Sequence, residues 1–365
     1  MPFQNPIDRI FSTPSREDWV RAAAKENEGK NPDETLNWKV GTIEGRAYYD
    51  KHDRPEDSFQ LPVSGNEYLG ARTWHNLPLI TVTNAQHANR IALAHLKNGA
   101  DGILFNIRQA DKIDLLVLLD AVEWPYCMVA FLAGKNQQDV INTIPDLAKT
   151  KKWDAGSLTG FVLWENEIAD VSVAFADFKQ FKTSGLLAAD SQDVVGQLTD
   201  SISAALKIKS ANGIIISVPV GTDFFVEQAK LKALRAIWAE HSPVEIFIHA
   251  RSTPWIAESF QPHGNMLKST TASMAAIAGG CDALTVYAEQ ETDLNMNRIA
   301  RNISNILREE SYLNKVADAT AGSYYVDALT KQIAEQVKAK LGSQLNSKSS
   351  TIRVFVSKRA PKIFR

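Results

Sequence analysis

From about residue 77 to residue 310, short apolar runs alternate with longer segments of helical periodicity. The runs are continuously apolar and do not alternate with polar residues, which is typical of parallel strands buried on both faces. Eight such strand-helix units follow one another. Their strands are predicted at LPLITVTN (77–84), GILFNI (102–107), PYCMVAFLAG (125–134), GFVLWENE (160–167), GLLAAD (185–190), GIIISVPV (213–220), VEIFIHA (244–250) and CDALTVYA (281–288).

This order predicts an α/β fold of the closed (β/α)8 TIM-barrel type, because parallel strands need helical crossovers between them. An open doubly wound sheet is the main rival. It is weakened because no G-x-G-x-x-G or phosphate-binding loop follows the first predicted strand. The interpretation places a helix after each strand, including 110–122 after the second and Val171 to Lys182 after the fourth.

The flanks of this pattern differ from it in composition. Residues 1–40 contain four prolines and one charged helix from about Arg16, capped by Ser15, and we expect them to form an N-terminal arm that contacts a partner. We expect residues 41–345 to be the barrel with a final helix, in which Leu329, Ile333, Val337 and Leu341 recur at four-residue steps. Residues 346–365 are expected to be a basic tail.

The charge balance excludes some classes of partner. The chain has 40 basic and 42 acidic residues, so no excess of positive charge points to nucleic acid or to a membrane surface. No stretch reaches the ~20 apolar residues of a membrane helix. The two cysteines, Cys127 and Cys281, are interpreted as free thiols, which fits a cytoplasmic location.

Polar residues at the carboxyl ends of the predicted strands are the candidate ligand-binding residues, because barrel sites form there. Glu165, Asp190, His249 and Arg251 occupy such positions, and Glu289 and Glu291 follow the last strand. Each residue taken alone is more often a cap that satisfies a neighbouring backbone group. No metal-binding cluster or G-x-S-x-G turn accompanies them, so the residues alone predict a fold and a polar rim but no reaction and no metal site.

Three segments near the end of the chain add a resemblance. QPHGNMLKSTTASMAAIAGGCDALTV, RIARNISNILREESYLNKVAD and DATAGSYYVDALTKQIAEQ are collinear between residues 261 and 336. They are similar to three motifs of the methylmalonyl-CoA mutase family. The N-terminal stretch PSREDWVRAAAKENEGKNPDETLNWKVGTIEGRAYYDKHD resembles the start of that family's small subunits.

The resemblance implies a radical isomerisation of methylmalonyl-CoA and succinyl-CoA that uses adenosylcobalamin. Family members bind the acyl-CoA along the barrel axis, and a separate domain with a D-x-H-x-x-G motif holds the cobalamin. In heterodimeric members, a catalytically silent small subunit supports a large catalytic subunit.

This sequence departs from the catalytic pattern of the family. Ala189-Asp190 stands where catalytic chains have Tyr-His, and an anionic aspartate would repel a developing oxyanion. Arg251 and Lys268 replace a glutamine and an arginine of the family motifs, and no D-x-H-x-x-G string is present outside a rejected Pro-containing one at residues 50–55.

These departures predict that the chain has no catalytic residues of its own and no cobalamin-binding domain. The first hypothesis is therefore a small-subunit-like mutase component in a heterodimer with a large catalytic subunit. Adenosylcobalamin is then expected in the complete enzyme and not on this chain alone, and binding of acyl-CoA to this chain stays open. The alternative is the catalytic barrel of a split acyl-CoA mutase whose cobalamin-binding domain is a separate chain. A barrel that binds some other anion near Arg251 and His249 stays open as a third interpretation.

Overall fold

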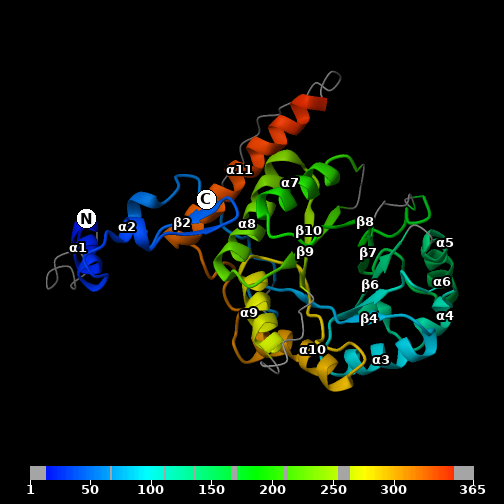
Figure 1. Ribbon diagram of the computed structural model, residues 1–365. Coiled ribbons are helices and arrows are strands. Elements are labelled where there is room, and N and C mark those ends of the chain that lie inside the picture. Colours follow the sequence, from blue (N-terminus) through cyan, green and yellow to red (C-terminus); the bar gives the residue numbers. More distant parts are fainter. Residues whose placement is uncertain are drawn as a thin grey trace.

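The computed structural model describes residues 14–348 apart from short gaps at 66–67, 111, 135–136, 166–170, 172, 209–212 and 254–263. Its centre is a sheet of nine strands that all pair in parallel, in the order β3-β11-β10-β9-β8-β7-β6-β5-β4. Helices flank the outside of this curled sheet (Figure 1). The α/β TIM-barrel class is confirmed.

The sheet closes on itself through one short stretch of chain. The two edge strands of the sheet, β3 (His75–Asn76) and β4 (Leu79–Thr81), are separated only by Leu77 and Pro78. The first pairs with the last strand, β11, and the second pairs with β5. Leu77 donates a backbone hydrogen bond to Leu284 at 2.9 Å, and Pro78 accepts one from Leu104 at 3.0 Å. Proline has no N–H to donate, which explains why the strand is interrupted there.

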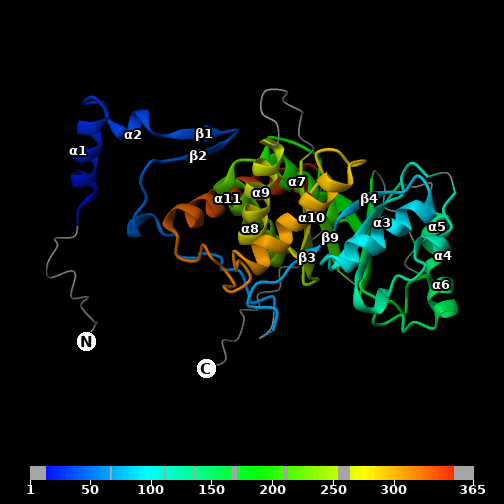
Figure 2. The ribbon, with the colours of Figure 1, turned by 90° about the horizontal axis from the view of Figure 1, so that it is seen from below.

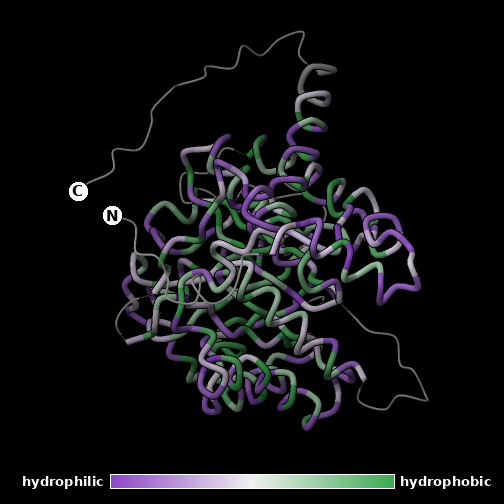
Figure 3. Tube along the Cα trace, turned by 90° about the vertical axis from the view of Figure 1, so that its left-hand side faces the viewer, coloured by the Kyte–Doolittle hydropathy of each residue, from purple (hydrophilic) through white to green (hydrophobic). Residues whose placement is uncertain are grey.

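The remaining strands follow the predicted order along the chain. They are β5 (Gly102–Asn106), β6 (Met128–Ala133), β7 (Gly160–Trp164), β8 (Phe181–Leu187), β9 (Ile214–Val220), β10 (Ile246–Ser252) and β11 (Ala283–Thr285). The main crossover helices are α3 (Ala85–Lys97), α4 (Leu115–Leu118), α5 (Gln138–Asn142), α6 (Ile144–Lys151), α7 (Val194–Ala205), α8 (Phe224–His241), α9 (Gly264–Ala278) and α10 (Leu294–Glu309). Along the tube in Figure 3, apolar segments gather towards the middle and polar ones towards the outside.

Two predicted helices were wrong in part or in whole. The helix expected from Val171 to Lys182 is absent from the described residues of that range, where 173–177 form turns and β8 begins at Phe181. The helix predicted at 110–122 is reduced to the four residues of α4. It is capped by Asp114, and the chain then turns through Ala121 in the left-handed region at φ 55°.

The helix after the barrel, α11 (Tyr324–Lys348), buries the face that the sequence predicted. Leu329, Ile333, Val337 and Leu341 are all fully or almost fully buried, and the helix lies along α7 and α8. Ser323 caps its start, since its Oγ accepts a hydrogen bond from Val326 N–H at 3.4 Å. The N-terminal part of the chain is attached to this helix.

That N-terminal part projects away from the barrel (Figures 1 and 2). It contains α1 (Arg16–Glu26), α2 (Pro32–Thr35), and a hairpin of β1 (Trp38–Val40) and β2 (Ile43–Gly45). The predicted cap is confirmed, because Ser15 and Asp18 exchange hydrogen bonds in a capping box. No residue of α1 is buried. The hairpin is held by α11, where Gln332 accepts a hydrogen bond from Glu44 N–H at 2.9 Å.

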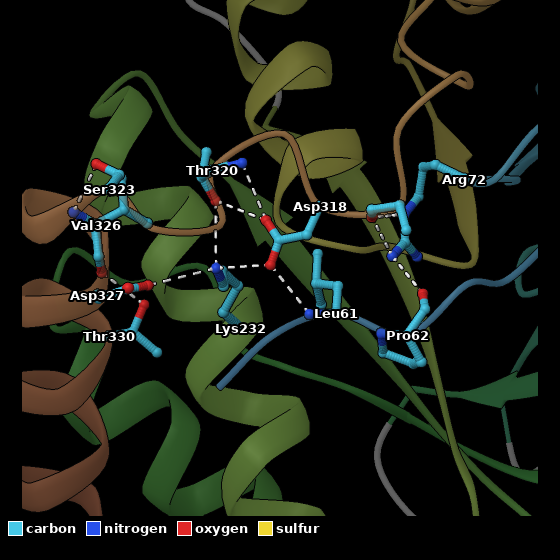
Figure 4. Close-up of polar contacts among 11 residues, drawn as sticks. Leu61, Pro62, Arg72, Lys232, Asp318, Thr320, Ser323, Val326, Asp327 and Thr330 are labelled. Atoms are coloured by element: carbon cyan, nitrogen blue, oxygen red, sulfur yellow. Dashed lines mark hydrogen bonds and ion pairs between the residues drawn. The ribbon is translucent and has the colours of Figure 1, made fainter. Parts of the chain in front are cut away.

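The loop before α11 is fixed by buried charges beside the start of the barrel (Figure 4). Lys232, fully buried on α8, lies 3.0 Å from Asp318 and 3.8 Å from Asp327. Asp318 also accepts the Leu61 N–H at 3.0 Å. Arg72 donates to the carbonyls of Ala317 and Pro62. These contacts tie the segment that enters the barrel to the segment that leaves it.

Candidate functional site

A cavity of about 510 Å³ lies at the carboxyl ends of the strands, where the sequence predicted the polar rim. Glu165, Asp190, Arg251, Glu289 and Glu291 line it. Arg108 and Arg301 complete its set of charged residues, so three arginines face four carboxylates. The cavity therefore carries a slight excess of negative charge and would not attract a multiply charged anion.

Arg251 and Asp190 are joined across two strands. Arg251 Nη1 donates to Asp190 Oδ1 at 2.8 Å, and its Nη2 donates to the Ala188 carbonyl at 2.7 Å. The arginine side chain is almost buried, whereas 55% of the aspartate side chain is exposed. Because β8 and β10 are both neighbours of β9, the two residues meet above that strand. The pair fixes the two side chains against each other, so Asp190 is not a free base.

A second ion pair crosses the same opening. Arg108, two residues beyond the end of β5, contacts Glu165 at the end of β7. Its Nε also donates to Asn106 Oδ1 at 3.0 Å. Arg108 was not among the residues predicted for the site, although it follows a predicted strand as closely as Arg251 follows another. The rule that selected Arg251 would have found it.

The opposite wall of the cavity is built by residues after β11. Glu289 accepts a hydrogen bond from Asn265 Nδ2 at 2.9 Å, and Glu291 accepts one from the backbone N–H of Thr81 at 2.9 Å. Tyr287, which the sequence interpretation did not include, lines the same cavity. Burial raises the pKa of its phenol above the ordinary value. Its hydroxyl is therefore neutral and acts as a hydrogen-bond donor or acceptor.

His249 lies below the cavity and does not reach it. The side chain is completely buried, with Nδ1 2.8 Å from Ser217 Oγ and Nε2 2.9 Å from Thr285 Oγ1. Thr285 donates its own proton to the Leu77 carbonyl at 2.7 Å, so it accepts from Nε2–H. Nδ1 then accepts from Ser217. Burial, with a smaller contribution from Arg251, lowers the pKa of His249 to about 3.

The interior of the barrel below the mouth is filled by side chains. Phe161 packs against His249 and Phe247, with ring centroids 5.6 and 5.7 Å apart. A buried apolar cluster surrounds these rings, and it includes Leu77, Leu104, Ala130, Leu163 and Ile215. Such a layer is a packed core, as in barrels whose interior holds no ligand.

The predicted site residues thus lie in three places. Glu165, Asp190 and Arg251 lie together at the mouth, whereas His249 is sealed beneath them. Lys268 lies on α9, half-buried, and is not among the residues that line the mouth cavity. Within the described part of the chain, no group of three His, Cys, Asp or Glu side chains could hold a metal ion. None of the described helices is long and apolar enough to cross a membrane.

Comparison with known proteins adds the family. The family described as Methylmalonyl-CoA mutase matches residues 193–347. The methylmalonyl-CoA mutase small subunit of Porphyromonas gingivalis is 26% identical over 390 residues, covering 89% of this chain and 62% of that protein. The small subunit of Streptomyces virginiae is 39% identical over 123 residues, covering 31% of this chain and 20% of that protein. The methylmalonyl-CoA mutase of Escherichia coli is 33% identical over 162 residues, covering 40% and 22%.

The chain therefore spans less than two thirds of the length of each of these relatives. The match to the family lies in the half of the chain that contains α7 to α11, including Asp318 and the two tyrosines that open α11. These similarities, together with the barrel architecture, make the chain similar to methylmalonyl-CoA mutases, most clearly over residues 193–347.

Proposed function

We propose that this chain is a small-subunit-like component of a methylmalonyl-CoA mutase, that it does not catalyse the isomerisation itself, and that it supports a large catalytic subunit. The observation that carries the proposal is the filled barrel axis. Phe161, Phe247 and His249 occupy the space through which an acyl-CoA would have to pass to lie along the axis. An open channel there would instead have favoured a catalytic chain.

The chemistry of the mouth supports the same proposal. An enolate-like oxygen needs a positioned donor, and Asp190 supplies a carboxylate that is already paired with Arg251. Moreover, the slight negative excess of the cavity disfavours the phosphates of coenzyme A. We therefore assign no catalytic residue to this chain. Glu165, Asp190 and Arg251 remain candidate contacts for a small polar ligand. His249 and Lys268 are weaker candidates, because neither lines the mouth cavity.

We also propose that adenosylcobalamin is held by the partner and not by this chain. The chemistry of the mouth does not fit a cobalt ligand. No described histidine lines the cavity, and His249 is buried with both ring nitrogens engaged in hydrogen bonds. The cobalamin-binding domain of the complex would then belong to another chain, and that chain would catalyse the isomerisation.

For the contact with the large subunit we propose the N-terminal arm of residues 1–40. Its helix α1 buries no residue in this chain and projects from the barrel (Figure 2). A helix this exposed gains little stability from tertiary packing, which is the usual source of helical stability. A partner that covers it would supply that packing. The remaining organisation follows as proposed from the sequence: a barrel unit at 41–345, a basic tail at 346–365, and a cytoplasmic heterodimer.

The alternative is that the chain is the catalytic barrel of a split mutase. The 510 Å³ cavity at the mouth favours it, since a chain with a purely structural role needs no such opening. The two proposals differ in whether this chain can turn over methylmalonyl-CoA without a large subunit.

The deciding experiment is co-expression of this chain with a large methylmalonyl-CoA mutase subunit. We expect the two to purify together, and we expect deletion of residues 14–30 from the arm to abolish the association while the barrel stays folded by circular dichroism. Turnover of methylmalonyl-CoA should need the large subunit. Turnover by this chain supplied only with adenosylcobalamin and a separate cobalamin-binding protein would overturn the proposal in favour of the split mutase.

A further inference from the structure

A second cavity lies on the outer wall of the barrel between α3 and α10, which run side by side in both ribbon views (Figures 1 and 2). Its volume is about 360 Å³. All the ionisable side chains that line it are basic, namely His87, Arg90, His95, Arg298 and Arg301. We call this cavity the basic groove. On a chain of net charge −2, it is a local concentration of positive charge.

Arg301 is the buried cation of the basic groove. Only 8% of the residue is exposed, and its Nε and Nη2 donate to Asn302 Oδ1 at 3.3 and 3.0 Å. Among the described residues, no carboxylate lies within ion-pair distance of Arg301, Arg298 or Arg90. Burial, together with the nearby charge of Arg298, lowers the pKa of the Arg301 guanidinium. A buried guanidinium with only a neutral amide acceptor lacks the compensation that buried charges ordinarily have.

His95 supplies a second, independent sign of a missing ligand. Only 4% of this residue is exposed, and its Nδ1 is a buried polar atom without a hydrogen-bond partner. Buried polar side-chain atoms normally have a partner, so each exception calls for an explanation. Burial and the charge of Arg301 lower the pKa of His95 to about 4, so the ring is neutral. A neutral imidazole can donate one N–H to an anion that sits beside Arg301.

Apart from Asn297, the other residues that line the groove are apolar. Leu294, 70% exposed, lines it together with Ile91 and Ala94. Towards the carboxyl ends of the two helices, Asn305 Nδ2 donates to the Asn98 carbonyl at 3.3 Å and bridges α10 to the turn after α3. Arg301 and Asn297 also line the mouth cavity, so the two cavities share a wall.

We propose that the basic groove binds a small organic anion, with a phosphate or carboxylate head between Arg90, Arg298 and Arg301 and an apolar body against Leu294. The head would pair with the buried guanidinium and accept a hydrogen bond from His95. The proposal does not depend on the function proposed above, since it concerns the outer wall of the barrel and needs no mutase partner.

The test is isothermal titration calorimetry of the full chain with four probes. Phenyl phosphate has the head and the body, inorganic phosphate has the head alone, benzoate has a carboxylate head, and benzyl alcohol has the body alone. We expect phenyl phosphate to bind one molecule per chain, more tightly than inorganic phosphate, and benzyl alcohol not to bind. Comparison of benzoate with phenyl phosphate identifies which head the groove prefers. Affinity should fall as salt is added, because the contact is electrostatic.

The variants Arg298→Gln and Arg90→Gln each remove an exposed guanidinium and should weaken phenyl phosphate binding by about tenfold. Arg301→Gln should abolish it, with the fold checked by circular dichroism. The matched control is Arg21→Gln on α1, whose arginine pairs only with Asp18 on the same helix; it should leave the affinity unchanged. Absence of saturable binding by phenyl phosphate, inorganic phosphate and benzoate up to about 10 mM would overturn the proposal. So would binding that survives in both Arg298→Gln and Arg90→Gln.

Discussion

His249 Nε2 lies 2.9 Å from Thr285 Oγ1, and this contact identifies Nε2 as the ring nitrogen that carries the proton. The Thr285 hydroxyl donates its hydrogen bond to the Leu77 carbonyl, so towards His249 it can only accept one from Nε2–H. On the other side of the ring, the Ser217 hydroxyl donates a hydrogen bond to Nδ1. A second proton on this histidine would require Ser217 to turn its own proton away, in a site that is closed to water.

This arrangement predicts a pH dependence of stability. The pKa of His249 is lowered to about 3 in the folded chain, whereas the unfolded chain has the ordinary value near 6.5. Below pH 6.5 the unfolded state therefore binds more protons, and the free energy of unfolding falls as the pH decreases from 6.5 towards 3. Each such histidine contributes a slope of up to about 1.4 kcal/mol per pH unit. Urea unfolding between pH 7.5 and 5 measures the slope.

The variant His249→Gln should unfold with a shallower slope than the parent chain over that range, because glutamine does not titrate. His95 has a pKa lowered to about 4 by burial and would contribute a second part of the slope. A control variant, His52→Gln, changes an exposed histidine and should leave the slope as it is. An identical slope in parent and His249→Gln chains would contradict the protonation state assigned here.

The packed barrel axis predicts a large loss of stability on truncation of Phe161. The residue is 1% exposed and packs against Phe247 and His249. Phe161→Ala should lower the free energy of unfolding by about 3–5 kcal/mol, since it removes a buried ring and leaves a cavity. Tyr126→Ala, at a side chain that is 88% exposed, should change it by less than about 0.5 kcal/mol. A small effect of Phe161→Ala would mean that the axis is loosely packed, and it would weaken the small-subunit proposal.

The buried charges around Lys232 predict a similar loss from a different cause. Lys232→Met leaves Asp318 and Asp327 buried without their cation, which should cost about 3–5 kcal/mol in chemical unfolding. Burial raises the pKa of Asp327, so this carboxyl takes up a proton more readily once the lysine is gone. The control is Lys338→Met, which breaks a half-exposed pair with Glu240 and should cost about 0–1 kcal/mol. Equal effects of the two substitutions would show that the buried lysine is not balanced by these aspartates.

The barrel itself could be predicted from sequence because its strands are continuously apolar and evenly spaced. The helix expected from Val171 to Lys182 failed for a definite reason. Phe175, Phe178 and Phe181 recur at nearly helical spacing, but they form an aromatic cluster, with ring centroids 4.9 to 6.2 Å apart, on a chain that turns into β8. Spacing alone cannot distinguish a helical face from turns that pack onto a sheet.

The candidate site was predicted only in outline. Position after a strand indicated that Asp190 and Arg251 lie at the same end of the barrel, and the structure pairs them. Position after a strand did not indicate how deeply each side chain is buried in the barrel. His249 and Arg251 point to the same side of β10 two residues apart, yet one is sealed in the core and the other lines the mouth. That difference depends on how the neighbouring strands are staggered, which the sequence of a single strand does not contain.

Tyr325, at the start of α11, is predicted to hold the hairpin of the N-terminal arm against the rest of the chain. Its ring contacts three others, with centroids 5.1 Å from Tyr49, 5.1 Å from Phe225 and 6.3 Å from Trp38. Tyr325→Ala should loosen the hairpin of β1 and β2, seen as faster amide exchange at residues 38–45, with little change in the barrel. Tyr324→Ala is the matched control, since Tyr324 shares none of these ring contacts. Unchanged exchange at the hairpin in Tyr325→Ala would mean that the hairpin is held by its hydrogen bonds to α11, from Glu44 N–H to Gln332 at 2.9 Å and from Gln336 to the Thr42 carbonyl at 3.1 Å.

Substitution of glycine by alanine should have opposite effects on stability at Gly322, in the turn before α11, and at Gly342, inside that helix. Gly322 has φ 81°, and no neighbouring atom lies within 4 Å of an added Cβ, so Gly322→Ala introduces backbone strain without a clash. It should lower the free energy of unfolding by about 1 kcal/mol. Gly342 lies inside α11 with equally open surroundings, so Gly342→Ala should raise it by about 0.5–1 kcal/mol through helix propensity. Thermal unfolding of both variants measures the pair, and a stabilising Gly322→Ala would mean that the turn tolerates a different backbone conformation.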